Sequence, residues 1–311
     1  MDKTNVTRIA NIYLLGFQIP QSVTLFMFFL FISLYCVTIC GNLLIITLVS
    51  YSRTLHSPMY FFLSQLSVLD IVLVTDILPN MISNALVKKT IMSFSDCLTQ
   101  FYFFVMVEPS ECLLLTVMSW DRYLAICKPL HYTLKMNYKV CWILVMLCWI
   151  CGTFVAIVNI VTISKLKFCG PNVIDHFFCD FDPILQLSCS DFTTALFEAQ
   201  ILGFTFVVIP FSIIIVSYAY IISTIFKMSS ITRHKVFSTC SSHLTVVCIY
   251  YGTLVCVYLI PNIGQTKTIT KLLSLLYTVF TPMINPIIYS LRNQELKNVA
   301  GKIIQNFLNM Y

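Results

Sequence analysis

The stretch TLFMFFLFISLYCVTICGNLLIITLVS, residues 24–50, decides the fold class. It lies within a run that contains no charged residue between Arg8 and Arg53. A helix needs about 20 mostly apolar residues to cross the hydrocarbon core of a bilayer, and this stretch is long enough. The sequence therefore predicts a membrane-spanning helix at residues 24–50.

The composition of the whole chain extends this conclusion. Of its 311 residues, 58% are hydrophobic and only 10% are charged, and the mean hydropathy is +0.86. A typical soluble domain has about 25% charged residues, which it needs to cover its surface. These values argue against a soluble enzyme, a disordered chain and a nucleic-acid-binding protein, and they indicate that most of the chain lies in a membrane.

Six further apolar stretches follow the first one. They cover about 58–82, 97–123, 140–163, 197–226, 236–260 and 272–291. We therefore expect an all-α membrane protein, a single seven-helix domain over residues 1–311. Residues 1–23 precede the bundle, and the tail at 292–311 contains apolar residues at helical spacing, which predicts a short amphipathic helix on the membrane surface.

The distribution of charge gives the expected orientation. With an extracellular N-terminus, eleven of the nineteen lysines and arginines lie on the cytoplasmic side and eight lie outside. This placement agrees with the enrichment of basic residues in cytoplasmic loops. It also places the sequon Asn5-Val6-Thr7 outside, where Asn5 is a candidate glycosylation site.

Ionisable residues inside the predicted spans are candidate functional groups because they are costly at membrane depth. Asp70 and Glu111 form a predicted polar centre, which Asn42 and Asn285 would link. This centre could hold a cation such as sodium, or its carboxyls could be protonated and hydrogen-bonded to neighbouring helices, since two close acids do not both ionise cheaply. Both interpretations stay open. Asn285 precedes Pro286, where we expect a helix kink whose free carbonyl a side-chain amide can partly satisfy.

Most of the fourteen cysteines fall inside the predicted spans, where they pack as small apolar residues. Four lie on the predicted outer side, namely Cys97 and, in the long loop at 164–198, Cys169, Cys179 and Cys189. Four cysteines allow three pairings, and an oxidising exterior favours disulfides. A bridge from the loop to Cys97 would hold the loop over the mouth of the bundle.

Four long strings of the chain resemble signatures of one protein family. Residues 118–127 read MSWDRYLAIC and resemble MAYDRYVAIC, and residues 55–64 read LHSPMYFFLS and resemble LHTPMYFFLS. Residues 235–243 read KVFSTCSSH and resemble KAFSTCSSH, and residues 282–293 read PMINPIIYSLRN and resemble PMLNPIIYSLRN. The family that these strings resemble is the vertebrate odorant receptors, which are rhodopsin-like (class A) G-protein-coupled receptors. The resemblance covers nearly the whole chain, with the strings in the family's order.

The resemblance implies a function and sites. A small volatile or metabolite would bind within the bundle and activate a stimulatory G protein of the olfactory type, raising cyclic AMP, at the plasma membrane of olfactory sensory cilia. The implied ligand-binding positions are Phe104, Val105, Glu108, Cys112, Gly203, Phe206, Val207, Tyr251, Leu254, Val255 and Tyr258. The implied activation and G-protein-coupling positions are Asp121, Arg122, Tyr123, Tyr218, His243, Asn285, Pro286 and Tyr289. The implied disulfides are Cys97–Cys179 and Cys169–Cys189. No enzymatic activity and no cofactor are expected.

Two departures from the family pattern stand out. Trp120 occupies a position where the family usually has tyrosine, and Glu108-Pro109 replaces small residues in the third span. A carboxylate at Glu108 would favour amines or hydrogen-bond donors, although it could instead be protonated and bonded within the bundle. The competing classes are a same-fold receptor for a non-odorant metabolite, a transporter, for which no internal repeat is evident, and an intramembrane enzyme, for which no catalytic string is present.

Overall fold

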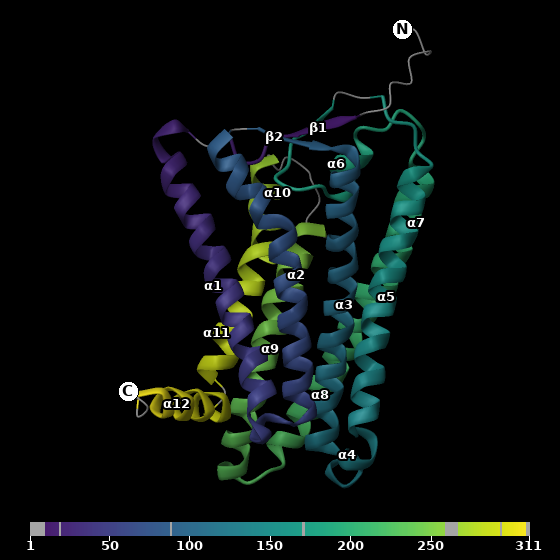
Figure 1. Ribbon diagram of the computed structural model, residues 1–311. Helices are drawn as coiled ribbons and strands as arrows, with labels where there is room; N and C mark the ends of the chain where they lie inside the picture. Colours follow the sequence, from purple (N-terminus) through teal and green to yellow (C-terminus); the bar gives the residue numbers. More distant parts are fainter. Residues whose placement is uncertain are drawn as a thin grey trace.

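The computed structural model describes residues 10–18, 20–87, 89–169, 172–258, 267–292 and 294–308. The long helical rods run side by side in Figure 1, and together they form a seven-helix bundle. Their bounds are α1 (Thr24–Tyr51), α2 (Pro58–Val87), α3 (Phe94–Cys127), α5 (Tyr138–Ser164), α7 to α8 (Thr193–Gly203 and Ile209–Phe226), α9 (Ser230–Tyr258) and α10 to α11 (Lys267–Leu275 and Thr281–Arg292). Six of these rods are long and apolar enough to cross a membrane, and α9 contains a shorter apolar segment, Cys240–Val255.

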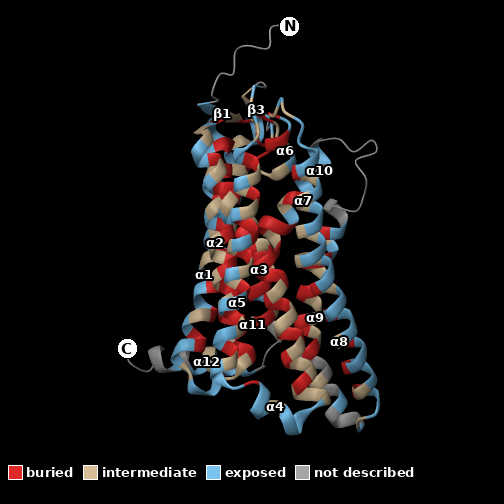
Figure 2. Cartoon of the chain, turned by 90° about the vertical axis from the view of Figure 1, so that its right-hand side faces the viewer, coloured by how far each residue is buried: buried red, intermediate tan, exposed pale blue. Residues whose placement is uncertain are grey.

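The rods differ in how much of their surface other helices cover. In the most apolar 18-residue windows of α2 and α3, 61% of the residues are buried, against 17% in α1 and 11% in the α7–α8 rod. Figure 2 shows buried residues along the centre of the bundle and exposed ones around it. The exposed residues of α1 and α8 are largely apolar, as expected for surfaces that face lipid.

Two of the rods contain a wider, π-helical turn. The segment η3 (Phe204–Val208) joins α7 to α8, and η4 (Leu276–Phe280) joins α10 to α11. Each ends two residues before a proline, Pro210 and Pro282, whose missing N–H interrupts the ordinary helical hydrogen bonds. A π turn accommodates such an interruption without ending the helix.

The two ends of the bundle carry different small elements. One end, here called the sheet end, has a three-stranded sheet in the order β2-β1-β3 and the short helix α6 (Phe181–Leu185). The other, here called the α4 end, has the turn η2 (Arg53–Leu55), the short helix α4 (Pro129–Lys135) and α12 (Gln294–Leu308). Helix α12 lies across the bundle axis in Figure 1, exposes Glu295 and Lys297, and buries Leu296.

The sheet joins three segments that are far apart in the chain. Strand β1 (Asn11–Leu14) pairs antiparallel with β2 (Thr90–Ser93) and parallel with β3 (Val173–Ile174). Ile12 and Leu14 are buried in a small second core with Cys97 and Phe101 at the top of α3. The hydropathy pattern did not predict this sheet, because its strands are two to four residues long and pair only over long separations.

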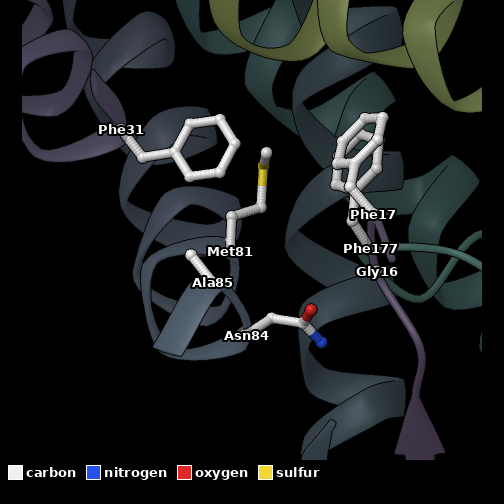
Figure 3. A pocket seen from close by; sticks show the side chains of 7 residues that line it. All are labelled: Gly16, Phe17, Phe31, Met81, Asn84, Ala85 and Phe177. Carbon is white, nitrogen blue, oxygen red and sulfur yellow. The ribbon is translucent and has the colours of Figure 1, made fainter. Parts of the chain in front are cut away.

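The chain then turns from β1 toward the bundle at Gly16, whose φ of 58° is in the left-handed region that favours glycine. A Cβ atom at Gly16 would collide with the side chain of Asn84, whose amide donates a hydrogen bond to the Leu14 carbonyl at 2.9 Å. Figure 3 shows this junction, where Phe31 and Met81 face the stacked rings of Phe17 and Phe177 across a cavity of about 10 Å³. That volume has room for about one water molecule.

Candidate functional site

Two residues of the predicted polar centre, Asp70 on α2 and Asn285 on α11, are in contact. The Asn285 amide donates hydrogen bonds to both carboxyl oxygens of Asp70, at 3.1 and 3.2 Å. Both side chains are buried, with exposed fractions of 1% for Asp70 and 4% for Asn285. The amide therefore serves the carboxyl of α2 rather than the proline kink beside it.

The kink at Pro286 is satisfied from another helix. Pro286 has no N–H to donate to the carbonyl of Pro282 one turn earlier, and the amide of Asn42 on α1 donates to that carbonyl instead, at 3.2 Å. The same amide donates to Thr38 at 3.0 Å. A Cβ atom on Gly41 would lie 3.1 Å from the Pro286 ring, so glycine permits this close contact.

The other two residues of the predicted centre have unused oxygen atoms. Among the described residues, Glu111 Oε1 and Asn42 Oδ1 are buried and have no hydrogen-bond partner. Carboxylate and amide oxygens are the ligands that hard cations prefer, so the donor set fits sodium in its chemistry. No group of three or more histidine, cysteine or acidic residues in the described part of the chain has the arrangement of a metal site.

The predicted ligand positions on α3 and α9 face each other inside the bundle. Phe104, Cys112, Tyr251 and Leu254 are buried, with exposed fractions of 3% or less. Tyr250, which the sequence analysis did not select, links the two helices. Its hydroxyl donates to the Glu108 carbonyl at 3.0 Å and lies 3.4 Å from the Cys112 sulfur.

The positions on the α7–α8 rod lie less deeply. Phe206, Val207 and Gly203 are half-buried, as are Val105 and Glu108 on α3, and a Cβ atom on Gly203 would meet no other atom within 4 Å. Phe211, which the sequence analysis did not select, stacks on Tyr251 with ring centroids 4.4 Å apart. The α8 contribution to this region therefore includes an aromatic residue one turn beyond Val207.

One predicted ligand position points elsewhere. Val255 is 40% exposed and lies on the same face of α9 as the exposed Cys248 and Gly252, away from the buried face of Tyr251 and Leu254. The helical repeat separates Val255 from Leu254 by about 100°. The structure therefore does not bring Val255 to the cluster between α3 and α9. The side chain of Tyr258 and the sequon at Asn5 lie outside the described part of the chain.

The long loop covers the cluster. Disulfides join Cys97 to Cys179, with Cα atoms 5.6 Å apart, and Cys169 to Cys189, at 5.8 Å. The first bridge holds Phe178 against Phe104, with ring centroids 5.0 Å apart. Sequence analysis missed Phe178 because the loop carries no helical or strand periodicity.

The same loop brings acidic groups to the mouth. Asp180 follows the bridged Cys179, and its carboxyl lies within electrostatic range of Glu108. Burial raises the pKa of Asp180 to about 6, and the hydrogen bond from the Phe181 N–H opposes that rise. The mouth above the cluster therefore carries negative charge at neutral pH.

The loop is also tied to the N-terminal segment. Lys271 on α10 donates to the Gly16 carbonyl at 2.7 Å and pairs with Asp175 at 2.5 Å. The sequence analysis places Lys271 just before the seventh span, which it expects to begin at residue 272. Next to Asp175, His176 is 4% exposed and stacks on Phe177. Burial, together with the nearby Lys271, lowers the pKa of His176 to about 3.

At the α4 end, the predicted activation residues form two buried contacts. Arg122 pairs with the adjacent, fully buried Asp121, with Nε 2.9 Å from the carboxyl oxygen. The other carboxyl oxygen of Asp121 accepts from Tyr132 on α4 at 2.9 Å. Tyr132 was not predicted, because its position depends on how α4 folds back beneath α3.

The second contact joins α8 to α9. The hydroxyl of Tyr218 lies 2.6 Å from Nδ1 of His243, and both side chains are buried. Tyr289 on α11 is also buried, and no described residue bonds its hydroxyl. Tyr123 lies apart from them and packs edge-on against Tyr220, with ring centroids 6.1 Å apart. The predicted inner residues thus form adjacent clusters rather than one network.

Comparison with known proteins identifies the family. A family model described as "Olfactory receptor" matches residues 31–307. Olfactory receptor 10A7 of Homo sapiens is 45% identical over 303 residues, which cover 96% of this chain and 95% of that protein. Olfactory receptor 1468 of Rattus norvegicus is 42% identical, with 98% of this chain and 97% of that protein covered.

A solved structure supports the fold. The crystal structure of squid rhodopsin superposes with a TM-score of 0.73, covering 94% of this chain and 88% of that chain, at 18% sequence identity. This likeness shows that the helices are arranged as in rhodopsin. The sequence relatives and the family model carry the assignment further: this multi-pass membrane chain belongs to the olfactory receptor family of G-protein-coupled receptors.

Proposed function

We propose that this odorant receptor binds a small volatile or metabolite between α3, the α7–α8 rod and α9, beneath the long loop. The observation that carries the proposal is the aromatic cluster in which Phe178 of the loop packs on Phe104 of α3, while Phe211 stacks on Tyr251. Small-molecule sites are mostly apolar and carry a few polar groups that orient the ligand. The Tyr250 hydroxyl and the Glu108 carboxyl are such groups here.

Glu108 would set the chemical preference of this site. Its carboxyl lies on α3 within electrostatic range of Asp180 of the loop, so a ligand between them would meet two carboxyl groups. An amine or a strong hydrogen-bond donor fits this environment, because a cation in an apolar site needs a charged partner. In the competing arrangement, Glu108 is protonated and bonds within the bundle, and neutral ligands are then favoured.

The sheet end would face outward and the α4 end the cytoplasm. This orientation exposes the disulfide-bonded loop to an oxidising exterior and makes Asn5 available for glycosylation. The plasma membrane of olfactory sensory cilia is the expected location. The polar centre at Asp70, Glu111 and Asn42 would hold sodium in the receptor without agonist, since its unused oxygens point to a small cation.

Activation would break the closed contacts at the α4 end. An agonist shifts the receptor toward an open state only if it binds that state more tightly. Opening would release Arg122 from Asp121 and separate Tyr218 from His243, which exposes an inner cavity to a stimulatory G protein of the olfactory type. Cyclic AMP would then rise.

A cyclic AMP reporter in cells that express the chain tests these proposals with a panel of amines and uncharged molecules of the same shape. We expect at least one ligand to raise cyclic AMP, and Arg122→Ala to abolish that response at equal surface expression. Glu108→Gln should weaken responses to amines more than responses to the uncharged molecules. An unchanged ligand profile would show that Glu108 does not contact ligand, and a response retained in Arg122→Ala would contradict the proposed coupling.

A further inference from the structure

We propose that a hollow beside α4 binds the headgroup of an inner-leaflet phospholipid that carries more than one phosphate. The hollow has a volume of about 250 Å³ and lies where the end of α3 meets α4. Its lining consists of three basic and three apolar or aromatic residues, namely Lys128, His131, Lys135, Trp120, Tyr123 and Leu124. The inference rests on the proposed orientation, and it needs neither the odorant nor the G protein.

The basic side of the hollow is unneutralised. Lys128, His131 and Lys135 are spaced by three and four residues, so they fall on one side of α4 and its N-terminal junction. All three are exposed, and none of the described residues that line the hollow is acidic. The neighbouring carboxyl of Asp121 is fully buried and already occupied by Arg122 and Tyr132. An anion entering the hollow therefore meets positive charge alone.

The opposite wall is apolar, which distinguishes a lipid from a free phosphate. Trp120 and Tyr123 lie on the last turns of α3, and Trp and Tyr side chains favour the boundary between lipid headgroups and hydrocarbon. Tryptophan at position 120 is also a departure from the family pattern, and it enlarges this wall. An apolar wall next to a basic rim matches a molecule with an anionic head and an apolar body.

The position of α4 places the hollow at headgroup depth. Leu130 and Leu134, four residues apart on another face of α4, are 88% and 75% exposed. A short helix with leucines on one face and bases on another lies in the membrane interface. With its leucines in the boundary region, α4 holds the three bases level with the phosphates of the inner leaflet.

The number of bases points to the class of headgroup. Each lysine near an anionic leaflet strengthens binding by about fivefold, so Lys128 and Lys135 together account for about 25-fold. A headgroup with a single net negative charge can make one such ionic contact. Three basic residues around one hollow match a headgroup with two or three phosphates. A phosphatidylinositol bisphosphate is therefore the preferred occupant, ahead of phosphatidylserine.

Native mass spectrometry of the purified full-length chain tests the proposal. The chain is titrated with phosphatidylinositol bisphosphate, phosphatidylserine, phosphatidylcholine and soluble inositol trisphosphate. The test variant carries K128Q, H131Q and K135Q together. The matched control carries K139Q and K227Q. It removes two lysine charges, as many as the test variant does, from exposed positions at the α4 end but outside the hollow. Thermal melting of each variant shows that it is folded, and K135Q alone provides a milder change at an exposed position.

We expect the triple variant to bind phosphatidylinositol bisphosphate about 25-fold more weakly, K135Q about fivefold more weakly, and the control within twofold of the unchanged chain. Phosphatidylserine should bind more weakly than the bisphosphate to the unchanged chain. Trp120→Ala should weaken lipid binding while leaving the weaker binding of inositol trisphosphate unchanged. Equal losses in test and control variants would overturn the proposal, as would soluble inositol trisphosphate binding as tightly as the lipid. Unchanged lipid binding with impaired G-protein activation would assign the hollow to a protein partner instead.

Discussion

The hydrogen bond from Asn42 to the carbonyl of Pro282 gives a sharp prediction, because it replaces a bond that Pro286 cannot make. Asn42→Ala removes it and leaves that carbonyl buried between α1 and α11. A hydrogen bond between membrane helices contributes about 0.6 kcal/mol on average and up to about 1.7 kcal/mol. A buried polar group without a partner costs about 1–3 kcal/mol. We therefore expect Asn42→Ala to lower the free energy of unfolding by about 1–2 kcal/mol.

The chain contains a matched control for this change. Asn159 on α5 is also buried, and its amide donates to Val155 in its own helix at 2.9 Å, as that of Asn42 does to Thr38. Asn159→Ala therefore removes an equivalent intrahelical bond without exposing a proline-freed carbonyl. The difference between the two variants isolates the contact with Pro282.

Thermal melting of the detergent-purified receptor measures the effect, with size-exclusion chromatography reporting how much receptor stays intact at each temperature. A loss of 1 kcal/mol lowers the melting temperature by about 2–4 °C in a domain of about 150–250 residues. A double-mutant cycle with Pro286→Ala sharpens the test, since alanine at position 286 restores the N–H that donates to the Pro282 carbonyl. In that background Asn42→Ala should cost no more than Asn159→Ala. If Asn42→Ala costs the same with proline and with alanine at position 286, the proposed compensation is refuted.

Four further changes test other contacts. Lys271→Met removes the ammonium group that bonds the Asp175 carboxyl and the Gly16 carbonyl, and should destabilise the receptor by about 1.5–3 kcal/mol, detectable as a lower melting temperature. Gly16→Ala forces a side chain into a left-handed backbone and against Asn84, at a cost of about 1–2 kcal/mol, and Asn84→Ala should relieve the steric part in a double variant. The pKa of His176 is 6.5 in the unfolded chain and about 3 in the folded receptor. As the pH falls, the unfolded chain therefore binds a proton before the folded receptor does, so the contribution to stability is complete above pH 6.5 and declines toward pH 3. His176→Phe should flatten that part of the plot of melting temperature against pH. Tyr132→Phe removes a bond to the carboxyl that pairs with Arg122 and should raise basal cyclic AMP about two- to fivefold in the reporter assay; an unchanged basal level would argue against a restraining role.

The fold was largely predictable because a bilayer leaves few alternatives. Each span must satisfy its backbone internally and must be about 20 residues long, so uncharged stretches locate helices directly. The structure has the expected seven-helix arrangement, and squid rhodopsin shows the same one. Sequence could not show that the fifth and seventh rods contain π turns, since that depends on how each helix accommodates its proline.

The site was predictable where a residue's chemistry limits its surroundings. Asp70 and Asn285 are costly to bury alone, and the structure brings them together. The role of Asn42 was only partly predicted, because which carbonyl its amide reaches depends on the crossing of α1 and α11. Apolar positions such as Val255 gave no such guidance, because a valine fits equally well against lipid or inside the bundle. The contributions of Phe178 and Tyr132 depend on loop folding, which local sequence does not encode.

The three-stranded sheet has a consequence for how the receptor is made. Strand β1 is its central strand, yet both partners are synthesised much later, β2 after α2 and β3 after α5. In the proposed orientation, β1 must therefore wait on the outer side of the membrane: β2 becomes available after two spans, and β3 only after four spans, α1, α2, α3 and α5, have been inserted. Contacts of such sequence separation form slowly. The mouth of the receptor is thus completed late in biogenesis, and any fusion partner or tag has to be attached ahead of β1 and leave its two edges free.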